Sequence, residues 1–193
     1  MATTKPLKPT EISNLFDSIE SRKYPRRDKA ILALSIYAGM RVSEIAKLKN
    51  EDVLNLNGIL KDEIVLNSRK NCHEPKVIYL SEKVKTSLNA YLIAKHDKHP
   101  SKAFFHADKA DFFTTNGLTQ WFFTRYRQAG IEASSDSGHK TFCQSLASKG
   151  VGIKTISSLV GHRHRSTTKR YLTGLYSEAT LMRSAVNLVS QVG

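Results

Sequence analysis

The sequence predicts a mainly α-helical protein with a small antiparallel β-sheet. Apolar residues recur at three- and four-residue steps through most of the chain, which is the period of an amphipathic helix. Residues 59–80 differ, because two short runs rich in Ile and Val flank a polar segment, as is typical of a β-hairpin. The 193 residues, 40% of them hydrophobic, are enough for one substantial core. We therefore expect residues 1–193 to form a single domain.

The first helices are predicted from their apolar faces and their ends. Pro9 opens an amphipathic helix that we expect to end near Ser21. Residues 28–38 are almost continuously apolar and stop at Gly39, which predicts a buried helix with a left-handed glycine cap. This helix should be the centre of the core. Residues 42–48 predict a short helix with acidic character in its first turn.

The β-hairpin and the later helices follow in order. The apolar runs 64–66 and 77–80 predict two strands on either side of the polar residues 67–76. Residues 95–115 are polar, contain Pro100 and predict a connector. Further helices are predicted at residues 82–94, 118–130, 140–148, 153–160 and 177–189.

Charge indicates a polyanionic partner. Lys and Arg number 30 against 17 Asp and Glu, so the formal net charge is +13. Such an excess favours DNA or RNA, although a basic ribosome-associated protein would share it. Cys72 and Cys143 have no zinc-site spacing, so we expect no disulfide and no metal. With no long apolar run and no signal-peptide core at Met1–Lys8, we expect a cytoplasmic or nucleoid-associated protein without a membrane partner.

The first motif that carries chemistry surrounds Arg41. It reads Gly39-Met40-Arg41-Val42-Ser43-Glu44 and ends at Leu48. An arginine two residues after a helix-ending glycine is held on a rigid scaffold, and its planar guanidinium can grip two oxygens of one phosphate. A lone arginine is more often a surface ion-pair partner, so the surrounding motif has to distinguish the two.

The second motif contains His162 and, nine residues later, Tyr171. It begins at Leu159-Val160-Gly161 and includes the hydroxyl residues 166–168, which we expect to cap the helix that carries Tyr171. Such spacing would allow His162 and Tyr171 to flank one phosphate. A tyrosine by itself is usually a packing residue, and the chain has seven. The motif, and not the residue type, singles out Tyr171.

Together these two motifs resemble the arginine box and the Leu-Gly-His box with tyrosine of the tyrosine site-specific recombinases, the phage integrase family. The resemblance extends from Gly39 to Tyr171, nearly the whole chain. It implies a mainly α-helical catalytic domain in which Tyr171 attacks a DNA phosphate and forms a 3′-phosphotyrosyl link. Arg41 and His162 would stabilise the pentavalent phosphorus, and neither a metal nor a nucleotide cofactor would be needed.

The resemblance also implies a lysine in the turn of the hairpin as general acid, and Lys70 is our choice. A lysine can protonate the departing 5′ oxygen when positive neighbours and partial burial lower its pKa. Arg69 and Lys76 lie close by and remain alternatives, as does a solvated lysine without a role.

One box departs from the family pattern. Asp136 stands where a histidine is expected, and His139 stands where the second phosphate-binding arginine is expected. Asp136 adds negative charge beside the phosphate, and a histidine is only partly protonated at neutral pH. We expect the two to pair on one helix, with Asp136 favouring the charged form of His139. The loss of one preorganised donor would cost roughly 3–4 kcal/mol in a comparable site.

The resemblance further implies double-stranded DNA as partner and a homotetramer on DNA. The helix at about 177–190 would either dock on a neighbouring protomer or pack on its own domain, since an amphipathic stripe does not name its partner. The N-terminal DNA-clamp domain of larger members is not expected in this sequence.

Two other functions stay open at this stage. A DNA-binding protein of the same fold with weakened or lost cleavage would explain Asp136 and His139. A strand-relaxing topoisomerase uses related tyrosine chemistry, but it fits the length and the box pattern less well.

Overall fold

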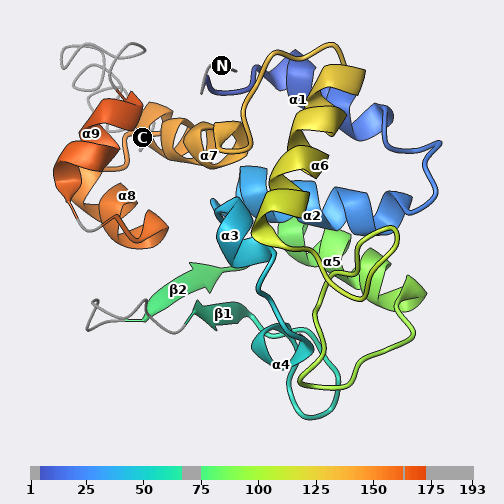
Figure 1. Cartoon of the computed structure of the whole chain (residues 1–193). Helices are drawn as coiled ribbons and strands as arrows, with labels where there is room; N and C mark the ends of the chain where they lie inside the picture. Colours follow the sequence, from blue (N-terminus) through green and yellow to red (C-terminus); the bar gives the residue numbers. More distant parts are fainter. Residues whose placement is uncertain (1–4, 67–74, 163, 173–193) are drawn as a thin grey trace, which may run out of the picture.

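The computed structural model describes residues 5–66, 75–162 and 164–172, and its architecture is shown in Figure 1. The described part is mostly helical with a two-stranded antiparallel sheet, which confirms the predicted fold class. In chain order the elements are α1 (Pro9–Asp17), α2 (Pro25–Tyr37), α3 (Val42–Ile45), α4 (Asn50–Val53), β1 (Glu63–Leu66), β2 (Lys76–Tyr79), α5 (Glu82–Ala94), α6 (Thr115–Gln128), α7 (Ser137–Ser148), α8 (Ile153–Val160) and α9 (Arg165–Leu172).

Helix α2 is the centre of the main hydrophobic cluster, as its continuous apolar run predicts. Residues 30–34 have no solvent exposure, and the helix packs against α5 and α7. The cluster collects side chains from the segments between Leu7 and Ala133, including both strands. Beyond the end of α2, Gly39 adopts a φ of 64°, which confirms the left-handed glycine cap.

The two predicted strands pair antiparallel, and buried and exposed side chains alternate around the pair of Ile64 with Ile78. Ile64 pairs with Ile78 and both are buried, whereas Glu63 pairs with Tyr79 on the exposed face. This follows from the two-residue period of a strand, which places successive side chains on opposite faces. The inner face therefore joins the main cluster.

A second, smaller cluster holds the C-terminal helices α7, α8 and α9 together. Its buried members are Cys143, Ala147, Ile156, Val160 and Leu172. In Figure 1 these helices lie to the left, and α7 reaches back to α2 in the middle of the molecule. Helix α7 therefore contacts both the main cluster, through α2, and the small one.

Several predicted boundaries are wrong. Helix α1 ends at Asp17 and α3 at Ile45, both earlier than expected, and α4 was not predicted at all. Helix α7 starts at Ser137 instead of residue 140, and its early turn contains Gly138, which disfavours a helix by propensity. Gly138 is tolerated because a Cβ there would lie only 2.2 Å from Ser35 Oγ, so a larger residue would separate α7 from α2.

Two predictions fall on residues outside the described ranges. These are the placement of Lys70 in the hairpin turn and the helix at 177–189. Within the described ranges, none of the helices combines the length and the apolar character needed to cross a bilayer.

Candidate active site

Arg41 is fixed between α2 and α3 by the glycine that precedes it and by Glu44. A Cβ on Gly39 would lie 2.3 Å from the ring of Phe142, so only glycine permits this approach of α7. The backbone N–H of Arg41 donates to the Glu44 carboxylate at 2.8 Å, and its Nη1 donates to the other oxygen at 3.3 Å. Arg41 thus has both its backbone and its guanidinium anchored.

Glu44 also binds a second cation, Lys76, which lies at the start of β2. Lys76 Nζ donates to Glu44 at 2.8 Å, and the side chains are only 12% and 14% exposed. Burial lowers the pKa of Lys76, and the charge of Glu44 partly offsets this effect. Two cations therefore share one carboxylate at the edge of the site.

His139 is buried on α7, with both ring nitrogens in contact with polar atoms. Its Nδ1 lies 2.6 Å from the carbonyl oxygen of Gly39, and its Nε2 lies 3.4 Å from His162 Nε2. Burial, reinforced by the positive charge of Arg41, lowers the pKa of His139 to about 3. The prediction that Asp136 favours a charged His139 is therefore wrong, because burial and neighbouring cations outweigh any carboxylate.

His162 follows the left-handed cap of α8 at Gly161, which has a φ of 64°. Its Nδ1 lies 2.9 Å from the hydroxyl of Thr168. Half-burial and then the charge of Arg41 lower the pKa of His162 to about 4. Thr168 belongs to the first turn of α9, which begins at Arg165, so this hydroxyl orients His162 instead of capping the helix as predicted.

The hydrogen-bond partners fix the tautomers of the two neutral histidines. Because a carbonyl oxygen only accepts, His139 Nδ1 carries the proton and its Nε2 is an acceptor. His162 Nε2 must then donate to His139, which leaves His162 Nδ1 to accept from the Thr168 hydroxyl. A single chain of hydrogen bonds runs from Thr168 through both rings to Gly39.

Tyr171 lies near the end of α9, beside both histidines. Its ring centroid is 5.2 Å from that of His162 and 5.7 Å from that of His139. The side-chain amide of Gln144 on α7 donates to the Tyr171 carbonyl at 3.2 Å and ties the end of α9 to α7. Half-burial, followed by the negative charge of Asp136, raises the pKa of Tyr171. The phenol is therefore protonated at neutral pH.

Asp136 is exposed and immediately precedes α7. Both ring nitrogens of His139 have other partners, as described above. Within the site, half-burial and then the negative charge of Asp136 raise the pKa of Tyr171, whereas the pKa of His139 is set by burial and by the charge of Arg41. Asp136 therefore opposes ionisation of the phenol.

The structure thus brings four of the six predicted site residues around one space, namely Arg41, His139, His162 and Tyr171, with Asp136 at its edge. Lys70 lies outside the described residues. Sequence reasoning assigned no site position to Glu44, and it considered Lys76 only as an alternative to Lys70. The signal for Glu44 was its place in the arginine box, three residues after Arg41.

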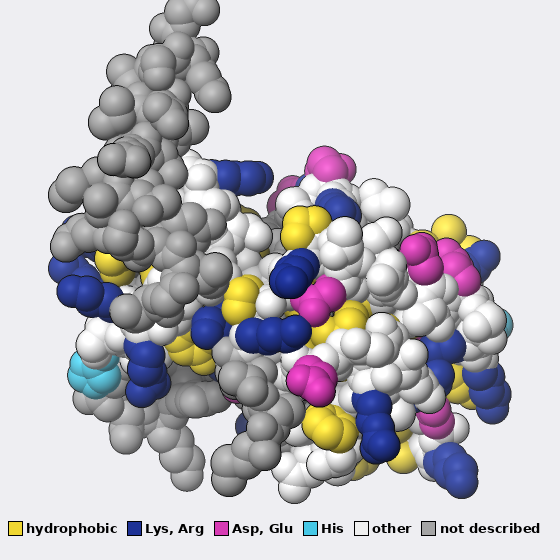
Figure 2. Space-filling view, turned by 90° about the horizontal axis from the view of Figure 1, so that it is seen from above, with side chains coloured by type: hydrophobic (Ala, Val, Ile, Leu, Met, Phe, Trp, Pro, Cys, Tyr) yellow, Lys and Arg dark blue, Asp and Glu magenta, His cyan; other side chains and the backbone are white. Residues whose placement is uncertain are grey.

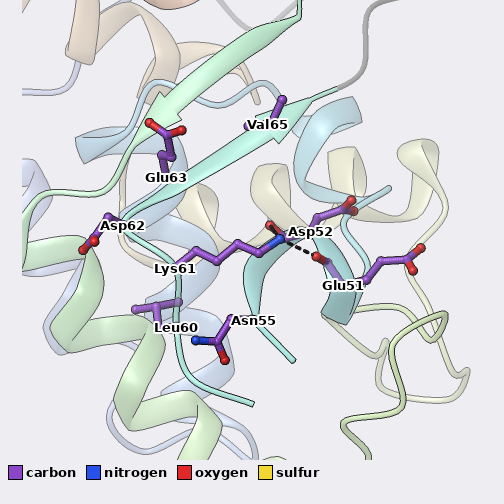
Figure 3. A pocket seen from close by; sticks show the side chains of 8 residues that line it. All are labelled: Glu51, Asp52, Asn55, Leu60, Lys61, Asp62, Glu63 and Val65. Carbon is purple, nitrogen blue, oxygen red and sulfur yellow. Dashed lines mark hydrogen bonds between the residues drawn. The ribbon is translucent and has the colours of Figure 1, made fainter. Parts of the chain in front are cut away.

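A shallow pocket between α4 and β1 is a separate feature, shown in Figure 3. It is lined by acidic side chains such as Glu51 and Asp62, and Lys61 crosses it to donate to the carbonyl oxygen of Glu51. It includes none of the predicted site residues. Within the described ranges, no group of three or more His, Cys, Asp or Glu side chains could hold a metal ion.

Comparison with known proteins identifies the family of this chain. The model of the phage integrase family matches residues 5–178. The tyrosine recombinase XerA of Thermococcus kodakarensis is 30% identical over 172 residues, which cover 86% of this chain and 57% of the relative. The chain spans about half the length of the curated relatives that it matches.

Solved structures share the fold. A crystal structure of XerA recombinase matches with a TM-score of 0.74 at 21% identity, over 95% of this chain and 64% of that one. The Tn1549 transposon integrase in complex with circular intermediate DNA matches with a TM-score of 0.72 at 17% identity, over 100% and 68%. Because the family model covers most of the sequence, this chain belongs to the phage integrase family of tyrosine recombinases.

Proposed function

We propose that this chain is the catalytic part of a site-specific DNA recombinase that cleaves and rejoins DNA through a 3′-phosphotyrosine. The observation that carries the proposal is the convergence of Arg41, His162 and Tyr171 around one space, although they lie between α2 and α3, after α8 and in α9, respectively. Guanidinium, imidazole and phenol are the groups that a phosphodiester transfer to tyrosine needs.

Arg41, His162 and Tyr171 have roles that fit their positions, and Lys70 is assigned its role by the family resemblance alone. The Tyr171 oxygen attacks phosphorus and breaks the bond to the 5′ oxygen, which receives a proton from Lys70. Arg41 and His162 hold the phosphate oxygens as negative charge develops. A 5′ hydroxyl of the same or another strand then attacks the phosphotyrosine, which restores the phosphodiester and the free phenol.

Duplex DNA is the proposed substrate, and a tetramer on DNA the proposed assembly. The net charge of +13 and the DNA-bound integrase among the structural neighbours support the substrate. In Figure 2, Lys and Arg side chains are spread over the visible face with Asp and Glu between them. Binding should therefore depend on many separate phosphate contacts, and it should weaken steeply as salt concentration rises.

A second candidate function is DNA binding by the same fold with weakened cleavage. The observation that favours it is the neutral His139 at the position of the second arginine, because it adds no positive charge to the pocket. In addition, the N–H of His162 Nε2 is directed at His139, so a phosphate must compete for it. Asp136 further disfavours the phenolate of Tyr171.

Covalent trapping separates the two functions. A nicked duplex that carries the protein's own site, selected from fragments of the source genome by binding, should accumulate a covalent protein–DNA adduct. Tyr171→Phe should abolish the adduct and leave binding intact, whereas Tyr79→Phe, a change on the exposed face of β2, should alter neither. Binding without any adduct in the unaltered protein would support the second function, and an adduct that survives Tyr171→Phe would overturn the assignment of Tyr171.

A further inference from the structure

Lys76 is held in the site by contacts that the roles proposed above do not use. Its Nζ and the backbone N–H of Arg41 donate to the same oxygen of Glu44, each at 2.8 Å, and the Arg41 guanidinium donates to the other oxygen. A carboxylate shared in this way cannot neutralise either cation completely. The charge left on Arg41 therefore depends on whether Lys76 is present.

The stem of Lys76 contacts a second part of the site. A Cβ on Gly161 would lie 2.8 Å from Lys76 Cδ and 3.3 Å from Cγ, so the aliphatic chain runs against the backbone of this glycine. Gly161 is the cap that directs the chain from α8 into His162. Lys76 thus links strand β2, the arginine box and the turn that carries His162.

The charge of Lys76 determines the net charge that the site presents to a phosphate. His139 and His162 are both neutral, so among these two histidines, Arg41, Lys76 and Glu44 the positive charge comes from Arg41 and Lys76, against one negative Glu44. If Lys76 were uncharged, Glu44 would cancel Arg41, and these five groups would present no net charge to a phosphate. An arginine at position 139 would have supplied that charge directly.

We propose that Lys76 is a positioning residue for DNA cleavage, which shares Glu44 so that Arg41 keeps its charge for the phosphate and which supports the turn before His162. The inference rests on the proposed function for its consequence in catalysis. The electrostatic effect of Lys76 on Glu44, Arg41 and the two histidines does not involve DNA. It can therefore be measured in the protein alone. A structural ion pair without electrostatic influence on the site is the competing explanation.

Histidine titration by NMR tests this electrostatic effect. Lys76→Met keeps the stem and removes the charge, and Lys76→Arg keeps the charge. The positive charge of Lys76 contributes to the depressed pKa of both histidines, so Lys76→Met should move the protonation of His162 to distinctly higher pH. Lys76→Arg should not. Lys85→Met is the matched control, because Lys85 pairs with Asp62 and Glu82 outside the site.

Titration curves that are the same in Lys76→Met and the unaltered protein would overturn the proposal. Should Lys76→Met fail to fold, Lys76→Gln provides the same comparison, since its amide can still donate to Glu44 without a charge. If both neutral variants unfold while Lys76→Arg folds, the charge serves stability, and the positioning role is rejected.

Single-turnover adduct formation on the nicked duplex tests the catalytic consequence. Lys76→Met should lower the rate on the order of tenfold to a hundredfold, and Lys76→Arg should recover most of it. An unchanged rate in Lys76→Met would reject the role in cleavage. If the unaltered protein forms no adduct, the proposed function fails, and the histidine titration still decides whether Lys76 sets the charge of the site.

Discussion

The two sides of the site differ in how they are supported. Arg41 follows α2, whose residues 30–34 are fully buried in the main cluster. His162 and Tyr171 are carried by the turn after α8 and by α9, and within the described residues the cluster that holds these helices has five buried members. Regions with fewer buried contacts open at a lower cost in free energy. We therefore expect the side that carries Arg41 to be the more rigid, and the side that carries His162 and Tyr171 to be the more easily displaced. Helix α7 joins them, and it carries the substitution that departs from the family.

The largest effect should come from restoring the family residues at the start of α7. Asp136→His with His139→Arg should raise the single-turnover cleavage rate by roughly a hundredfold or more, since one preorganised donor is worth about 3–4 kcal/mol. The arginine adds a permanent charge, and removing Asp136 also lowers the pKa of Tyr171. Covalent trapping on the nicked duplex measures the gain.

Asp136→Asn alone separates the two contributions. It should lower the pKa of Tyr171 without adding a donor, and the rate should rise only a few-fold. If the double variant cleaves no faster than the unaltered protein, His139 does not limit the cleavage rate. The position of α7 between the two sides would then have no consequence for cleavage.

A stability test addresses the junction of α7 with the rigid side. Gly39→Ala should lower the free energy of unfolding by about 3 kcal/mol, because a left-handed φ of 64° is strained for alanine and the new Cβ would overlap the ring of Phe142. Gly58→Ala is the control. Its φ of 73° carries the same backbone strain, but no atom lies within 4 Å, so it should cost only about 1 kcal/mol. Denaturant unfolding compares the two.

Equal losses in these two variants would mean that α7 can move away from Gly39 without cost. The two sides of the site would then be joined less tightly than the contact with Phe142 indicates.

Local patterns were enough to predict the rigid side. The continuous apolar run of α2, the glycine cap and the two β-favouring runs of the hairpin each reflect a short-range rule, and the structure confirms all three. The convergence of Arg41, His162 and Tyr171 was predicted from two boxes more than a hundred residues apart, which required the resemblance to a family.

The errors come from contacts between distant segments. The charge state of His139 was predicted wrongly from the three-residue spacing between Asp136 and His139. Burial against Gly39 and the proximity of Arg41 keep His139 neutral, and neither contact can be read from local spacing. The start of α7 was placed too late because Gly138 disfavours a helix locally, while its close packing on Ser35 favours it. Tertiary packing decided both.

Stability should fall in acid because His139 is held neutral. Its pKa is lowered from 6.5 to about 3 on folding, so between these values the unfolded state binds a proton that the folded state does not. The free energy of unfolding should therefore decrease as pH falls below about 6.5. His139 alone contributes a slope approaching 1.4 kcal/mol per pH unit, and His162, whose pKa is lowered to about 4, adds to this slope down to about pH 4.

Denaturant unfolding at a series of pH values measures this slope. His139→Gln should make it shallower and leave the part that His162 contributes, while His164→Gln, a change at an exposed histidine, should not change it. If His139→Gln leaves the acid slope unchanged, other groups account for the slope. The contact of α7 with Gly39 through His139 would then not depend on pH.

The smallest predicted effect concerns the support of His162 on the weaker side. Thr168→Val preserves the shape of a fully buried side chain and removes the hydroxyl that donates to His162 Nδ1. The loss should cost about 1 kcal/mol of stability. Without this donor, the proton of His162 should shift partly from Nε2 to Nδ1, which NMR of the ring nitrogens detects. Thr167→Val, one residue earlier on α9, should leave the tautomer unchanged. A tautomer that is indifferent to Thr168 would mean that His139 alone orients His162, so that α7 and not α9 controls the imidazole that faces the phosphate.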